Sequence, residues 1–170
     1  MPNRSFQEPR LVRVGAEVLL SGTALGLLIE EVIAKDCPFR FQARGFSMSP
    51  FIKDEDLITI FPCSDRSPRL GDVVAYIQPE SRKLIVHRII DRKKGDCCTK
   101  GDSMDSPDGW IPGDKIIGRV GRVERKGKPI SLGLGPERVA VAILSRENLL
   151  MRLSSLLWRI SRTTVRRQKP

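Results

Sequence analysis

The sequence lacks a long apolar segment and is poor in aromatic residues. Its longest uncharged stretch, residues 18–29, stops at Glu30, well short of the roughly 20 residues that cross a bilayer. Aromatic residues make up 5% of the chain, which argues against a surface that stacks nucleic-acid bases. Charged residues run through Arg13 and Glu17 without a small-residue cleavage site, so no secretory signal is expected. We therefore predict a cytoplasmic chain that does not cross the membrane.

Cysteine is also scarce, with four residues in the chain. Cys37, Cys63, Cys97 and Cys98 form no pair of metal-ligand dipeptides, and adjacent cysteines do not readily bridge to each other. In a protein with a medium-sized core, this pattern indicates reduced thiols rather than a disulfide framework. No metal or organic cofactor is implied.

Positive charge is abundant but unevenly distributed. The formal net charge is +10, and residues 138–170 contain eight basic residues against the single acid Glu147. Such a tail forms either a solvated basic face or a peripheral contact with an anionic membrane surface. The low aromatic content and the clustering of charge in an amphipathic segment favour lipid over nucleic acid.

The apolar pattern divides the chain into three parts. Residues 1–38 are a helical segment, because apolar residues recur with helical spacing over residues 10–35, interrupted by Gly22 and Gly26. Residues 39–134 carry short β-branched runs between turn residues, which predict strands. Residues 135–170 form a basic amphipathic helix or helix pair. The predicted strands are Phe39–Ala43, Asp56–Phe61, Asp72–Ile77, Lys83–Asp91 and Lys115–Arg125.

These elements predict a mainly β fold with flanking N-terminal and C-terminal α-helices. The strands are short and separated by regular turn signals, so we expect a coiled antiparallel sheet or partly open barrel. A chain of 170 residues is long enough for one domain with a substantial core and too short for two ordinary ones.

The candidate chemistry lies in this β-rich part. Ser47 stands in a short turn between Gly45 and Pro50, and the only histidine of the chain, His87, follows forty residues later. A serine hydroxyl is a poor nucleophile at neutral pH, so it needs a neighbouring base. His87 is expected on the apolar face of its strand, where desolvation keeps an imidazole neutral, as a general base requires. Taken alone, each residue also fits an ordinary turn or a buried core histidine.

An acid that orients the histidine would complete such a site. Asp102, Asp105 and Asp108 all lie in one predicted turn, Lys100–Asp108, and any of them could accept a hydrogen bond from the second ring nitrogen. Acids, Ser, Pro and Gly at this density also fit ordinary turn chemistry. The residues themselves leave the choice among the three acids open.

Taken in order, these segments resemble the successive conserved boxes of the signal peptidase I family, over residues 40–125. LexA-type self-cleaving proteases have the same fold and the same first motif, in which a glycine is followed by any residue, a serine and a methionine. Histidine in place of the usual lysine resembles the endoplasmic-reticulum and archaeal branch of signal peptidases. The matching segments are Gly45–Pro50, Asp56, Gly71–Val74, Val86–Ile89, Thr99–Asp102 and Ile117–Val120.

The resemblance implies a role for each matching residue. Ser47 is the nucleophile, His87 the general base and Asp102 the acid that orients it, while Asp108 matches a second functional acid. It also places Gly45, Met48 and Pro50 at the substrate and oxyanion site. Many signal peptidases have a serine where this chain has Gly45, so the oxyanion here would depend on backbone donors such as the Ser47 amide.

The expected function is a serine endopeptidase of signal-peptidase type that cleaves an extended leader or signal-like peptide, or a preprotein, with a preference for small side chains before the scissile bond. The absence of an apparent anchor departs from that family. Two alternatives remain open. One is a soluble LexA-like regulatory or leader-peptide protease. The other is an inactive β-domain binding module whose basic tail engages a membrane or nucleic acid.

Overall fold

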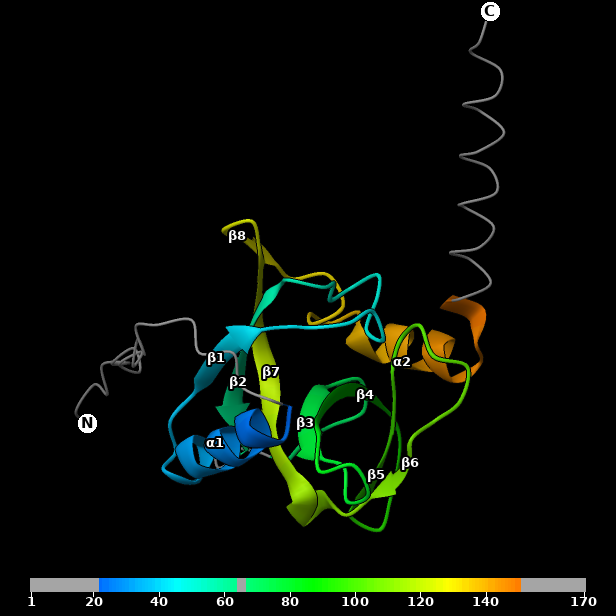
Figure 1. Cartoon of the computed structure of the whole chain (residues 1–170). Coiled ribbons are helices and arrows are strands. Elements are labelled where there is room, and N and C mark those ends of the chain that lie inside the picture. Colours follow the sequence, from blue (N-terminus) through cyan, green and yellow to red (C-terminus); the bar gives the residue numbers. More distant parts are fainter. Residues whose placement is uncertain (1–21, 64–66, 151–170) are drawn as a thin grey trace, which may run out of the picture.

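The computed structural model describes residues 22–63 and 67–150, which form a mainly β structure with a helix near each end (Figure 1). The two α-helices are α1 (Gly22–Ala34) and α2 (Arg138–Arg146), and a short 3₁₀ helix spans Gly113–Lys115. The strands are β1 (Phe39–Gln42), β2 (Leu57–Pro62), β3 (Val73–Ile77), β4 (Leu84–Lys93), β5 (Asp96–Lys100), β6 (Gly109–Ile111), β7 (Ile116–Arg125) and β8 (Lys128–Ile130).

All strand pairs are antiparallel, and the sheet has the order β1-β2-β7-β3-β4-β5-β6, with β8 attached to β7. The long strand β7 pairs with β2, β3 and β8 along different parts of its length, so it joins the two halves of the sheet. Register shifts interrupt three of the pairs, as expected where a sheet bends. Within the described residues the sheet does not close, and its strand order begins at β1 and ends at β6.

Strand β3 lies between β7 and β4 and is buried on both faces, which explains its continuous apolar sequence. Val73 and Ala75 belong to one core cluster, which also holds Ile29 and Ile33 of α1. Val74 and Tyr76 belong to a second cluster on the opposite face. Helix α1 is therefore held against the sheet by burial of its own apolar face.

The mainly β fold with flanking helices is confirmed, and all five predicted strands occur, with ends that differ by one or two residues. Strands β5, β6 and β8 were not predicted, because β6 and β8 have three residues each and β5 has a polar residue at both ends. No disulfide bond joins the four cysteines, all of which lie in the described part of the chain.

The terminal predictions are only partly covered by the structure. The predicted helix over residues 10–35 is observed from Gly22 onward, and its earlier residues lie outside the described part. Helix α2 is the beginning of the predicted basic tail, of which residues 151–170 also lie outside the described part. Within the described ranges, neither helix has the length and apolar character to span a membrane.

Candidate active site

Ser47 lies in the turn that follows edge strand β1. Gly45 has a φ of +96°, a backbone conformation that favours glycine, and its N–H donates to Asp54 Oδ1 over 2.8 Å. Met48 is buried in the same core cluster as Ile29, and its carbonyl accepts from the N–H groups of Phe51 and Ile52. The turn is thus anchored on both sides of Ser47.

A second loop holds this turn from the other side. The N–H of Ser103 donates to the Ser47 carbonyl over 2.9 Å, and the Ser103 hydroxyl donates to the Phe46 carbonyl over 2.7 Å. These two bonds tie the Ser47 turn to the loop 101–108, which separates β5 from β6. Segments more than fifty residues apart in the sequence therefore meet at the serine.

His87 lies on β4, opposite Val74 of β3. It faces the cluster that contains Ile85 and Ile89, as strand alternation predicted, and its side chain is 9% exposed. Its Nε2 lies 3.1 Å from Ser47 Oγ, and its Nδ1 lies 2.6 Å from Asp108 Oδ2. If Nδ1 carries the ring proton and donates it to the carboxylate, Nε2 is left to accept the serine proton.

Asp108 is the carboxylate that contacts His87. Its backbone N–H donates to the Thr99 carbonyl over 2.8 Å, and the Thr99 hydroxyl donates to Oδ2 over 2.9 Å. Burial alone would raise the pKa of Asp108, but the hydrogen bond and charge of His87, with hydrogen bonds from Thr99 and Tyr76, lower it below its usual value. The carboxyl is therefore ionised at neutral pH, as an acceptor for His87 requires.

Asp102 has a different partner, so the prediction that it orients His87 is wrong. Its two oxygens accept from Nε and Nη2 of Arg88, at 2.8 and 2.7 Å, and both side chains are 0% exposed. His87 and Arg88 are consecutive in β4, so their side chains point to opposite faces of the sheet. Asp102 pairs with Arg88 on one face, and Asp108 contacts His87 on the other. Asp105 is exposed and has no hydrogen bond to His87.

The Arg88–Asp102 pair is fully enclosed. Nη1 of Arg88 donates to the carbonyls of Gly71 and Gly133, and its guanidinium lies 5.3 Å from the centre of the Phe51 ring. Burial raises the pKa of Asp102, and the hydrogen bonds and charge of Arg88 oppose that rise. This pair joins the start of β3, the end of β5 and the loop before α2, beneath the candidate site.

Gly101 permits the Ser47 turn, His87 and Met104 to approach one another closely. A Cβ atom at this position would lie 2.6 Å from Met104 Cγ, 2.7 Å from the Ser47 carbonyl oxygen and 3.0 Å from His87 Nε2. Any side chain here would therefore push against the base and the nucleophile turn. The same distances place the Met104 side chain beside the Ser47–His87 contact.

The residues predicted at the oxyanion and substrate site fall into different environments. The N–H of Gly45 is already bonded to Asp54, so this residue offers no oxyanion donor. Met48 is buried in the core and cannot line a substrate surface without rearrangement. Pro50 is exposed. The N–H of Ser47 has no hydrogen-bond acceptor within the described residues, so it remains the available backbone donor.

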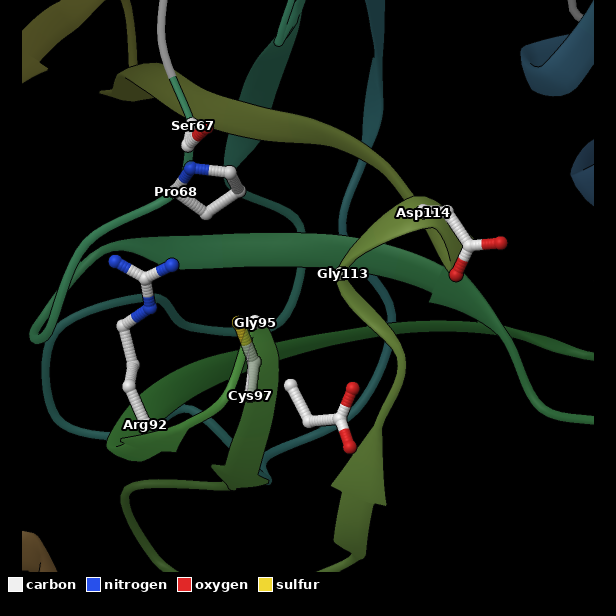
Figure 2. Close-up of a pocket in the computed structure, with 8 residues that line it drawn as sticks. Ser67, Pro68, Arg92, Gly95, Cys97, Gly113 and Asp114 are labelled. Carbon is white, nitrogen blue, oxygen red and sulfur yellow. The ribbon is translucent and has the colours of Figure 1, made fainter.

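Two hollows of the surface lie away from the serine site. One of about 350 Å³ lies at the β4–β5 hairpin, where Arg92, Cys97 and Asp114 contribute to its lining (Figure 2). Another of about 270 Å³ lies between β7 and the segment that follows β8. Neither is lined by Ser47, His87 or Asp108. Neither hollow therefore contains the serine, histidine and carboxylate. The serine site is identified by the hydrogen bonds among these three side chains.

Three supporting residues were not identified as such from the sequence. Arg88 pairs with Asp102, Ser103 holds the Ser47 turn, and Lys100 donates to the Ser145 carbonyl and Asn148 Oδ1 at the end of α2. Arg88 and Ser103 stand next to the predicted site residues His87 and Asp102, and Lys100 lies two residues before Asp102, which is the only signal that the sequence offers. Their roles depend on strand register and on the docking of α2.

Comparison with protein-family models, curated proteins and solved structures gives no significant match to this chain. The site is therefore classified by its geometry. A serine hydroxyl, an imidazole and a carboxylate in one hydrogen-bonded series form the arrangement of a nucleophile, a general base and an orienting acid.

Proposed function

We propose that this protein is a serine endopeptidase of signal-peptidase type, which cleaves an extended leader or signal-like peptide. The observation that carries the proposal is the series Ser47, His87 and Asp108, joined by contacts of 3.1 and 2.6 Å. Its order in the chain is the one that the resemblance to the histidine-type signal peptidases implies.

In the first half of the reaction, Ser47 Oγ attacks the carbonyl carbon of the scissile bond while its proton passes to His87 Nε2. The resulting imidazolium is stabilised by the ionised Asp108. The tetrahedral oxyanion accepts a hydrogen bond from the Ser47 N–H. His87 then gives its proton to the leaving amine, the C–N bond breaks, and an acyl ester remains on Ser47.

In the second half, a water molecule takes the place of the leaving amine. His87 removes a proton from the water, the hydroxide attacks the ester carbonyl, and the C–O bond to Ser47 breaks. The proton returns through His87 to Ser47 Oγ. The products are two peptides, and the enzyme is restored without a cofactor entering any step.

Two surface features support an extended peptide as the substrate. Among residues 22–63 and 67–150, strand β1 pairs with β2 alone, and it runs directly into the Ser47 turn, so its other edge can pair with a peptide in extended conformation. Phe46 and Met104 are 71% and 45% exposed on the two loops that meet at Ser47. Exposed apolar side chains beside a nucleophile suit contact with apolar residues near the scissile bond.

The proposal is tested with a library of extended peptides and the purified full chain. We expect cleavage by the unaltered protein and a loss of about 10³-fold or more in the Ser47→Ala variant, because the nucleophile is removed. Ser49→Ala is the matched control, since Ser49 lies in the same turn without contacting His87, and it should cleave like the unaltered protein. Equal cleavage by Ser47→Ala would refute the assignment.

A soluble LexA-like protease would use the same residues and differ only in its substrate, so the preferred library sequences bear on that alternative.

The binding-module alternative is favoured by exposed apolar side chains on helix α2. Val139 and Ile143 are exposed one helical turn apart on α2, at the start of the basic tail. We propose that residues 138–170 make a peripheral contact with an anionic membrane surface, whether or not the site is active.

A further inference from the structure

Two buried hydroxyl groups lie near Asp108 in addition to His87. Thr99 of β5 and Tyr76 of β3 are both almost completely buried, and Tyr76 Oη lies 3.2 Å from Thr99 Oγ1. Thr99 Oγ1 in turn lies 2.9 Å from Asp108 Oδ2, the oxygen that contacts His87. These side chains come from β3 and β5, the two strands that flank β4, and meet on the face of the sheet that carries His87.

Counting protons shows which of these groups donate to the carboxylate. The Thr99 hydroxyl has one proton, and an ionised carboxylate can only accept, so Thr99 donates to Asp108. The Tyr76 hydroxyl also has one proton, which it gives either to the Thr99 oxygen or to Asp108. In both arrangements Asp108 accepts from His87 and Thr99, and Tyr76 is a donor beside them.

The ionisation states of Tyr76 and Asp108 agree with these roles as donor and acceptor. Burial raises the pKa of Tyr76 far above its usual value, so its hydroxyl keeps its proton and remains a donor. The pKa of Asp108 is lowered despite burial, in part by its hydrogen bonds with Thr99 and Tyr76. Hydrogen bonds in such a series polarise one another, which strengthens the donation to the carboxylate.

We propose that Thr99 and Tyr76 are positioning residues that hold Asp108 ionised and aimed at His87 Nδ1. This inference rests on the proposed function. Asp108 lies at the end of a loop with its side chain 24% exposed, so its own backbone does not fix the carboxylate direction. Thr99 supplies that restraint twice, through its carbonyl to the Asp108 N–H and through its hydroxyl to Oδ2.

The consequence for the reaction is a fixed tautomer of His87. A carboxylate held against Nδ1 keeps the ring proton on that nitrogen and leaves Nε2 as the acceptor for Ser47. When Thr99 no longer donates, Asp108 can turn toward solvent, and the ring proton is shared between the two nitrogens. Substrate binding should be largely preserved, since neither hydroxyl faces the surface.

The lone histidine makes a direct test available. With ¹⁵N-labelled histidine, the full chain gives a single pair of ring nitrogen signals, whose shifts report how the proton is divided between Nδ1 and Nε2. At a pH at which the imidazole is neutral, we expect the unaltered protein to hold the ring proton on Nδ1. Thr99→Val should move both shifts toward a mixture of tautomers, Tyr76→Phe should move them less, and Thr99→Ser should restore them.

Activity provides the second readout. Thr99→Val should lower kcat about 10-fold to 100-fold with little change in KM, because a hydrogen bond to an ionised group is lost behind the base. Thr59→Val is the control for replacing a buried strand threonine, since Thr59 is buried on β2 and has no contact with Asp108. Thermal unfolding of each variant identifies effects that come from stability alone.

The outcomes separate this inference from the proposed function. A Thr99→Val protein that folds and keeps the ¹⁵N shifts of the unaltered protein would overturn the positioning role, whatever its activity. If Thr99→Val fails to fold, Thr99→Ala takes its place, and unchanged shifts in both Thr99→Ala and Tyr76→Phe overturn the positioning role. If the shifts move as expected while Ser47→Ala cleaves like the unaltered protein, the hydrogen-bonded series stands and the peptidase assignment fails.

Discussion

Asp102 and Asp108, two of the three aspartates of the loop 101–108, show how nearby residues with the same chemistry acquire different roles. Asp108 accepts from His87 and Thr99, whereas Asp102 is enclosed with Arg88 on the other face of the sheet. A buried ion pair that loses one partner leaves an uncompensated charge, which costs about 3–5 kcal/mol. The two residues should therefore differ in what their replacement damages.

The matched replacements Asp102→Asn and Asp108→Asn test this difference. Asp102→Asn should lower the free energy of unfolding by about 3 kcal/mol or more, because Arg88 remains buried without a counter-charge. Asp108→Asn should leave stability within about 1 kcal/mol and lower kcat about 10³-fold, because His87 loses the acceptor that fixes its tautomer. Urea unfolding at neutral pH and steady-state cleavage measure the two effects. The reverse pattern would assign the catalytic role to Asp102.

Helix α2 is connected to the site through the end of β5. Its last turn receives hydrogen bonds from the buried Lys100, which lies between Thr99 and Gly101 at the end of β5. Arg138 and Arg146 of α2 pair with Asp72 and Asp91 on the sheet side, at 3.1 Å each. The basic tail therefore begins on a helix that is tied to the strand behind the proposed active site.

The tail itself can be tested for membrane contact in the full chain. Replacing the basic residues that follow α2 by glutamine should weaken binding to phosphatidylserine vesicles roughly 10-fold or more, since each basic residue near an anionic surface contributes about 1 kcal/mol. Sedimentation against neutral phosphatidylcholine vesicles measures the electrostatic part. The residues to be changed together are Arg152, Arg159, Arg162, Arg166, Arg167 and Lys169.

The control for this experiment is a variant in which the same number of positive charges is removed from the β-sheet part of the chain. Exposed lysines of the strands and their connections are replaced by glutamine, and vesicle binding should be retained. If the two proteins lose binding equally, the contact depends on net charge and the tail has no specific role. The control residues are Lys53, Lys93, Lys94, Lys115, Lys126 and Lys128.

For the molecule as a whole, the sequence predicted what depends on local pattern. The period of apolar residues and the turn signals were sufficient for the mainly β fold and for five of the strands. Ser47 and His87 were predicted because a serine in a turn between Gly and Pro and a single histidine can be recognised in the sequence alone. The face of β4 on which His87 lies also followed from alternation alone.

What the sequence could not supply depends on register and on three-dimensional neighbours. Three acids stand in one loop, and only the pairing of β4 with β5 and the path of the loop decide that Asp108 reaches His87. The partners of Asp102 and Lys100 lie 14 and 45 residues away on other elements. The hydroxyls of Thr99 and Tyr76 meet because β3, β4 and β5 are adjacent in the sheet.

The most direct test of the central claim, that Ser47 is a nucleophile activated by His87, is detection of the acyl-enzyme. An activated ester of a cleaved library peptide is mixed with the full chain, quenched in acid and analysed by mass spectrometry after digestion. We predict that the acyl group is added to the fragment that contains Ser47, and that Ser47→Ala and His87→Gln show no adduct. An adduct on another residue, or an equal adduct in Ser47→Ala, would contradict the account.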